Sequence, residues 1–202
     1  MLAEGARAAT RSVPLGPSLG QCCGGHVDLE FERFETPPAI APAPTPLWLY
    51  GAGHVGRAVV AAFAPLSFAI TWVDDAPDRF PAKIPDHATP LMAADPAAAV
   101  PRAPDDAVHV VMSYSHAIDL AICHAVLSRR FAHLGLIGSD TKAARFRSRL
   151  AALGHDGATI ARLTCPIGDR SLGKEPGAIA IGLASRLLQL RNGTGRGIES
   201  NA

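Results

Sequence analysis

The sequence contains two groups of residues that could do chemistry, and the more informative one is the glycine pattern Gly51-x-Gly53-x-x-Gly56. In a strand–turn–helix context, the first glycine allows the tight turn, the second lets a phosphate approach the backbone, and the third lets helix and strand pack closely. The bare amides and the dipole at a helix start attract anions. This stretch therefore predicts a phosphate cradle, with His54 facing the bound group.

The second group is the pair Cys22-Cys23, which is followed by Gly24-Gly25. Flexible glycines would let a thiolate approach a ligand closely, and a thiolate carries sulfur or binds a soft metal. The alternative is that these cysteines are small apolar fillers. Of the other two cysteines, Cys123 has the spacing of a buried helix face, whereas Cys165 in its Pro/Gly loop fits either role.

The elements around the glycines have the order that the motif requires. An apolar strand over residues 47–50 precedes them, and an apolar helix over residues 53–63 begins at the second of them. A second apolar strand, residues 68–73, ends at Asp74-Asp75. An acid about 20 residues beyond the glycines is where such folds place their ribose contact, and it favours NAD over NADP.

The rest of the chain alternates in the same way, which predicts an α/β fold: a Rossmann-like, doubly wound parallel sheet with helices on both faces. A small N-terminal appendage precedes it, joined by a Pro-rich linker. The further strands are expected at residues 88–92, 108–112 and 134–137, with helices at 95–100 (weak), 116–130, 141–153 and 175–190.

Ligands of open parallel sheets lie beyond the carboxyl ends of the strands, so these ends predict the pocket. Ser115 is expected to cap the helix that starts at His116, and Asp140 the basic helix after it. His116 and Asp119 either orient each other at the pocket rim or form a surface pair. The cofactor-binding candidates outside the glycine turn are Asp74, Ser113, His116, Gly138, Ser139 and Lys142, the last because it could reach an anion.

Four segments are expected. Residues 1–36 form an N-terminal piece that carries the cysteine pair and a half-exposed strand over residues 27–32, where apolar and acidic residues alternate. Residues 37–46 are a Pro-rich linker. The Rossmann-like domain spans residues 47–191, and residues 192–202 form a disordered tail.

Composition excludes several classes of protein. The 202 residues carry a net charge of +1, which argues against nucleic acid as the main partner. No stretch is long and apolar enough to suggest a membrane helix, and the start lacks the apolar core of a signal peptide. The spacing of the four cysteines fits neither a disulfide scaffold nor a zinc ribbon. We expect a cytoplasmic protein with reduced thiols.

Several blocks taken together resemble the XdhC/CoxI family, the xanthine dehydrogenase accessory proteins. The resemblance covers most of residues 21–190 and is far more specific than the glycine pattern alone. The blocks are Gln21-Cys22-Cys23-Gly24-Gly25, Gly51-Ala52-Gly53-His54-Val55-Gly56, Trp72-Val73-Asp74, Leu136-Ile137-Gly138-Ser139, Thr164-Cys165-Pro166-Ile167-Gly168 and Gly173-Lys174-Glu175-Pro176.

The resemblance implies a chaperone for the molybdenum cofactor, a pterin phosphate that carries a molybdenum dithiolene. Such proteins protect the cofactor while a cysteine desulfurase installs its sulfido ligand, and then hand it to xanthine dehydrogenase. By position, Cys22 would be the thiol nearest the molybdenum, with Cys23 beside it, and the residues of the glycine turn would line the phosphate. A homodimer is also expected.

The sequence departs from the family pattern in two places. The usual His-Asp-His after the fourth strand is replaced by Tyr114-Ser115-His116, so only the last histidine remains. The domain that commonly precedes the cysteine pair is missing, which suggests either a fragment or a short form with impaired cofactor binding. Two alternatives therefore stay open: an NAD(P)-dependent oxidoreductase that uses the glycine turn, and a structural partner subunit with a vestigial site. Whether the protein is an enzyme is left open, with a non-catalytic assembly factor favoured.

Overall fold

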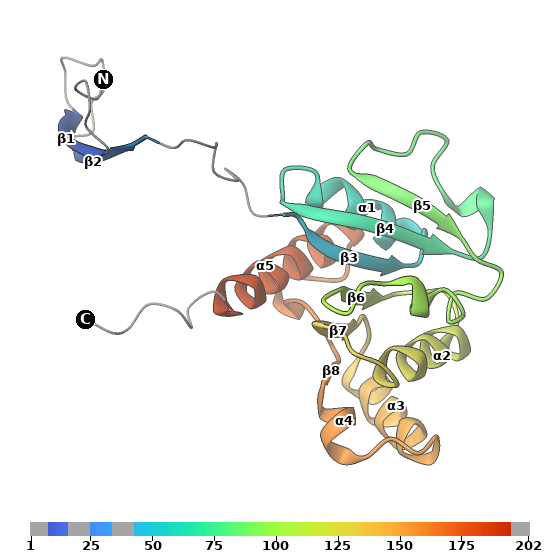
Figure 1. Ribbon diagram of the computed structural model, residues 1–202. Helices are drawn as coiled ribbons and strands as arrows, with labels where there is room; N and C mark the ends of the chain where they lie inside the picture. Colours follow the sequence, from blue (N-terminus) through green and yellow to red (C-terminus); the bar gives the residue numbers. More distant parts are fainter. Residues whose placement is uncertain (1–7, 16–24, 34–42, 195–202) are drawn as a thin grey trace. The chain divides into compact units, whose positions relative to one another are not determined.

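The computed structural model describes residues 8–15, 25–33 and 43–194, and the chain divides into two units, residues 1–42 and 43–202 (Figure 1). The strands and helices are β1 (Ala8–Leu15), β2 (Gly25–Glu32), β3 (Thr45–Tyr50), α1 (His54–Phe63), β4 (Phe68–Asp74), η2 (Pro77–Arg79), β5 (Ala88–Met92), η3 (Val100–Arg102), β6 (Val108–Val111), α2 (His116–Leu127), β7 (His133–Leu136), α3 (Asp140–Ala152), α4 (Gly157–Ala161), β8 (Leu163–Thr164), η4 (Arg170–Leu172) and α5 (Pro176–Thr194).

The second unit is built on a six-stranded, wholly parallel sheet with the order β5-β4-β3-β6-β7-β8 (Figure 1). The chain moves outward from β3 to β4 and β5, then returns to β6 on the other side of β3 and moves outward again. The strand order therefore reverses between β3 and β6, at the point where such sheets bind ligands. This topology confirms the predicted Rossmann-like fold.

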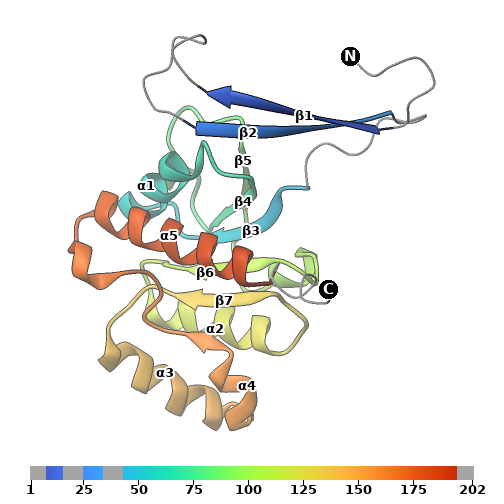
Figure 2. The same cartoon turned by 90° about the vertical axis from the view of Figure 1, so that its left-hand side faces the viewer.

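Helices cover both faces of the central strands, which explains why β3, β4 and β6 are largely apolar. Along β3, Leu47 and Leu49 face a core shared with α1 and α5, whereas Trp48 and Tyr50 face a core shared with α2 and α3. Figure 2 shows α5 running along one face of the sheet, with α2 and α3 on the other side. The site thus lies at the ends of strands β3 and β6, which are buried on both faces of the sheet.

The two edges of the sheet are short or interrupted. The edge strand β5 carries Pro90, which has no backbone N–H to donate. At the opposite edge, β8 has only two residues, Leu163 and Thr164.

The first unit contains an antiparallel hairpin of β1 and β2. The strand expected over residues 27–32 is found, but its partner β1 was not predicted, because residues 8–15 show no clear alternation. Leu29 and Phe31 on β2 remain 41% and 37% exposed. The strand is therefore more exposed than the half-buried strand that its alternating pattern predicts.

Other expectations need correction or remain untested. The weak helix over residues 95–100 is wrong: the segment forms consecutive turns in which Ala98 bonds back to Asp95, and Ala99 to Pro96. These bonds join residues three apart, as in a 3₁₀ turn, and the segment runs directly into η3 at Val100. The strand β3 begins at Thr45, inside the predicted linker, and α5 continues to Thr194. Most of that linker lies outside the described residues.

Across the described ranges, no helix combines the length and the apolar character that crossing a bilayer requires.

One polar side chain in the core has a consequence for pH dependence. His109 on β6 is fully buried, its Nδ1 lies 3.0 Å from the hydroxyl of Tyr50, and its Nε2 has no hydrogen-bond partner. Burial, with a smaller effect from the charge of Arg129, lowers the pKa of His109 to about 4. The ring is therefore neutral in the folded protein at neutral pH.

We expect this histidine to make the fold sensitive to acid. In the unfolded chain this histidine has a pKa near 6.5. As the pH falls below that value, the unfolded chain binds a proton that His109 in the folded protein does not bind. The free energy of unfolding should then drop by about 2 kcal/mol between pH 7 and pH 5 from this group. Urea denaturation of the protein and of His109→Gln at both pH values measures it, and equal losses in the two proteins would contradict the prediction.

Candidate functional site

The glycine turn joins β3 to α1, and its geometry requires glycine at two positions. Gly51 has a φ of +121°, and a side chain there would meet the carbonyl of Met112. A Cβ on Gly56 would lie 2.0 Å from the carbonyl oxygen of Gly51. The indole of Trp72 donates to that same oxygen at 2.9 Å. The first turn of α1 is thus held directly against the end of β3.

Gly53 plays a different part, because a Cβ there would meet nothing within 4 Å. It precedes the first residue of α1, whose leading amides have no acceptor within the helix. The space in front of them is a cavity of about 480 Å³, here named the glycine-turn cavity. It is lined by Gly51, Ala52, Gly53, His54, Val55, Gly56, Arg57, Asp74, Asp78, Arg79, Met112, Ser113 and Tyr114.

Asp74, expected to contact a ribose, instead holds the turn in place. Its side chain is 4% exposed, and Oδ2 accepts the amide of Ala52 at 2.6 Å. Its Oδ1 accepts the amide of Asp75 at 2.8 Å and the guanidinium of Arg79 at 3.0 Å. The carboxylate therefore ties the end of β4 to the glycine turn, and its protein partners leave little of it for a ligand.

A second group of side chains lies at the rim of this cavity. The guanidinium of Arg79 pairs with Asp75 at 2.5 Å and lies 3.7 Å from the ring centre of Tyr114, whose hydroxyl donates to Asp75 at 2.8 Å. The pKa of Asp75 lies below its ordinary value. Burial is the largest single influence and raises it, but the hydrogen bond from Tyr114 and the charge of Arg79 are among several contacts that together lower it by more. Sequence reasoning missed Arg79, which belongs to no local motif. It named Tyr114 only as a departure from the family's His-Asp-His pattern and gave it no role, because its partners Asp75 and Arg79 are distant in the sequence.

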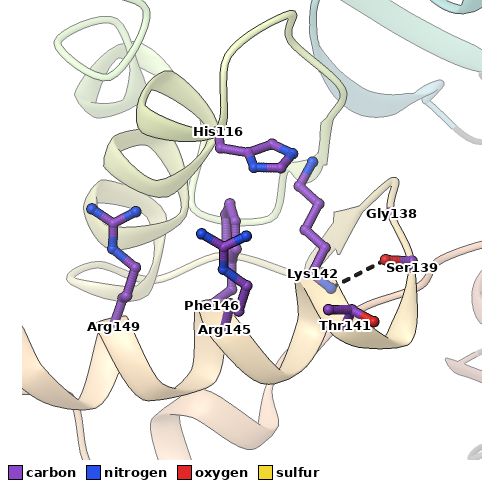
Figure 3. Close-up of a pocket in the computed structure, with 8 residues that line it drawn as sticks. All are labelled: His116, Gly138, Ser139, Thr141, Lys142, Arg145, Phe146 and Arg149. Atoms are coloured by element: carbon purple, nitrogen blue, oxygen red, sulfur yellow. Dashed lines mark hydrogen bonds between the residues drawn. The ribbon is translucent and has the colours of Figure 1, made fainter.

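The remaining candidates line a separate cavity of about 320 Å³ between α2 and α3, here named the α3 cavity (Figure 3). The structure therefore divides the predicted site into two. The glycine-turn cavity holds Gly51, Gly53, His54, Gly56, Asp74 and Ser113, and the α3 cavity holds His116, Gly138, Ser139 and Lys142.

Lys142 is not the free cation that the sequence suggested. Its ammonium lies 2.6 Å from Oδ2 of the fully buried Asp119 and donates to the carbonyl of Ile137 at 3.0 Å. The other oxygen of Asp119 accepts the amide of Ser113 at 2.9 Å. In the part of the chain that is described, His116 and Asp119 share no hydrogen bond, so the expected mutual orientation is replaced by the Asp119–Lys142 pair.

Of the two predicted helix caps at this edge of the sheet, one is confirmed and one is wrong. Ser115 caps α2 as expected, since its hydroxyl accepts an amide of the first turn. At α3 the cap is Ser139, whose hydroxyl accepts the amide of Lys142 at 3.1 Å, and not Asp140. Asp140 instead begins the helix and pairs with Arg170 at 2.5 Å.

Comparison with known proteins identifies the family. The family model described as the XdhC Rossmann domain matches residues 47–187. The chain belongs to the XdhC family. The expected resemblance is thus confirmed over the whole sheet, from β3 to the second half of α5.

Two similar proteins are longer than this chain. The uncharacterized protein YqeB of Escherichia coli (strain K12) is 28% identical over 182 residues, which cover 90% of this chain and 32% of YqeB. The crystal structure of a xanthine dehydrogenase from Bacillus halodurans has a TM-score of 0.63 and 19% identity, and the match covers 85% of this chain and 48% of that one. The chain therefore spans a third to a half of these relatives.

The thiols of this XdhC chain divide between described and undescribed residues. Cys22 and Cys23, predicted to lie near the molybdenum, are outside the described residues. Cys123 is buried in the core as predicted, and burial raises the pKa of its thiol. Cys165 is also buried, with its thiol pKa raised for the same reason. Within the described ranges, no group of three or more His, Cys, Asp and Glu side chains could hold a metal ion.

The two glycines of the XdhC turn should respond differently to substitution. Gly53→Asp should leave the free energy of unfolding nearly unchanged, because its Cβ faces open space and its φ of −70° suits any residue. Gly56→Ala should cost about 3 kcal/mol, since α1 must move away from β3. Urea denaturation compares the two variants, and equal stabilities would contradict this account of the turn.

Removing one partner of the buried Asp119–Lys142 pair should destabilise the fold more than removing both partners. Asp119→Ala should lower the free energy of unfolding by roughly 3 kcal/mol, because it leaves the ammonium of Lys142 in a site that is 12% exposed. The double variant Asp119→Ala/Lys142→Met should recover part of that loss. A double-mutant cycle in urea measures the coupling, and strictly additive effects would show that the pair contributes nothing.

Proposed function

We propose that this XdhC-family chain binds the molybdenum cofactor, protects it while a cysteine desulfurase installs the terminal sulfido ligand, and delivers it to xanthine dehydrogenase. The observation that carries the proposal is the match of the XdhC Rossmann model across residues 47–187. The Bacillus halodurans protein is described as a xanthine dehydrogenase, but at 19% identity its likeness supports the fold alone.

The glycine-turn cavity suits the phosphate-bearing side of such a cofactor. Its volume of about 480 Å³ lies within the usual range for small-molecule sites. The open face of Gly53 and the leading amides of α1 offer donors to an anion with no side chain in the way. The molybdenum end of the proposal depends on Cys22, with Cys23 beside it, and these residues lie outside the described ranges.

Each residue around the cavity has a defined task in this proposal. Gly51 and Gly56 shape the turn, and Asp74 fixes it to β4. His54 lines the cavity and can donate a hydrogen bond to a bound group, whereas the hydroxyl of Ser113, which also lines it, donates to the carbonyl of Ser115. Tyr114 is 65% exposed and lies at the mouth, where its stack with Arg79 would limit the access of water. When bound, the cofactor would supply the molybdenum centre needed by the client enzyme.

An NAD(P)-dependent oxidoreductase is the competing function, and the glycine turn at the switch point of a Rossmann sheet favours it. The carboxylate of Asp74 speaks against it, because the oxygens that would accept a ribose hydroxyl already accept Ala52, Asp75 and Arg79. We therefore place the cofactor chaperone first. Xanthine dehydrogenase, the desulfurase and a second copy of the chain are the proposed partners.

The test is to identify what the protein carries. The full chain is produced in cells that synthesise molybdopterin and is purified without oxygen, and the small molecules released on denaturation are identified by mass spectrometry. Molybdopterin is expected. Release of NAD or NADP, together with saturable micromolar binding of either in calorimetry, would favour the oxidoreductase instead.

The cysteine variants test the metal end of the proposal. Cys22→Ser should reduce the retained molybdopterin about tenfold, because a hydroxyl is a much poorer ligand than a thiolate for a soft metal. Cys123→Ser is the matched control, since that thiol is buried in the core away from either cavity lining. Equal retention by the two variants would mean that Cys22 does not contact the cofactor.

A further inference from the structure

The α3 cavity contains two arginines that the proposed function does not use. Arg145 and Arg149 stand one turn apart on α3, and both line the cavity. Figure 3 shows their guanidinium groups rising from α3 toward α2, the helix that carries His116. Across residues 8–15, 25–33 and 43–194, neither guanidinium lies within ion-pairing distance of a carboxylate, as the ion pairs found there join other residues.

The charge of this cavity is positive and unbalanced. The ammonium of Lys142 is neutralised by Asp119, which leaves the two arginines without a counter-charge. Like charges four residues apart on a helix repel each other and destabilise it slightly. A bound anion would therefore reduce the repulsion between the two guanidinium groups in this concave site.

The glycine-turn cavity differs in this respect. Its lining has two carboxylates, Asp74 and Asp78, and two guanidinium groups, Arg57 and Arg79, so its side-chain charges balance. The amides of α1 supply only partial positive charge there. Of these two cavities at the carboxyl edge of the sheet, the α3 cavity therefore attracts a dianion more strongly.

We propose that the α3 cavity binds the phosphate group of a small phosphorylated ligand. A guanidinium fork matches phosphate oxygens with two parallel hydrogen bonds, and two forks match the charge of a dianion. The hydroxyls of Ser139 and Thr141 line the same cavity and can donate as well. A volume of about 320 Å³ exceeds what a lone phosphate needs, which leaves room for the group that carries it.

The cavity wall also fits an organic group attached to the phosphate. The exposed imidazole of His116 is the ring that α2 contributes to the lining, and it stands edge-on to the buried ring of Phe146 on α3, with centres 6.2 Å apart. An imidazole beside a guanidinium pair can stack on a flat group attached to the phosphate. This proposal does not depend on the molybdenum cofactor. Inorganic pyrophosphate, which contains no metal, can test it.

The experiment uses the full chain and inorganic pyrophosphate as the probe. Calorimetry in about 150 mM salt, where exposed charges are largely screened, should give saturable binding. Amide shifts in ¹⁵N NMR should concentrate at residues 116 and 138–149. The double variant Arg145→Gln/Arg149→Gln should bind at least about tenfold more weakly, since it removes both charge-assisted hydrogen-bonding groups from the probe's site.

Arg147→Gln is the matched control, because Arg147 is exposed on the same helix but does not line the cavity. Its affinity for pyrophosphate should change less than about twofold. Thermal unfolding checks that all variants remain folded, as expected for exposed positions. Equal weakening in the control, shifts confined to residues 51–57, or the absence of saturable binding would each overturn the proposal.

Discussion

The structure depends on the close contact between the first turn of α1 and the end of β3. Gly56 permits this contact, since even a Cβ at that position would collide with the carbonyl of Gly51. Trp72 and Asp74, both from β4, then hold the turn by a hydrogen bond to that carbonyl and another to the next amide. Three consecutive elements are thus fixed by one steric condition and two bonds, and the cavity in front of α1 takes its shape from them.

A second buried network organises the other half of the carboxyl edge. Asp119 accepts the amide of Ser113 and the ammonium of Lys142, so it connects the end of β6, the first turn of α2 and the start of α3. Ser113 lines the glycine-turn cavity and Lys142 lines the α3 cavity. The two cavities therefore share a supporting carboxylate, although their linings have different charge.

Much of the fold could be predicted from local patterns. The apolar strands, the glycine turn and the cap at Ser115 each depend on residues that are close in sequence, and the structure agrees with them. The roles of Asp74 and Lys142 could not be predicted in this way. Their partners, Ala52 and Asp119, are 22 and 23 residues distant, and only the packed sheet brings them together. The same holds for the contact of Arg79 with Tyr114, which the sequence does not suggest.

The two sheet edges limit how this domain can associate with other chains. Joining a further strand to a sheet requires a long row of free backbone donors and acceptors. At one edge Pro90 removes a donor from the middle of β5, and at the other β8 offers only two residues. Another protein chain that contacts this domain would therefore have to dock on helix surfaces or around the strand ends, where both cavities open.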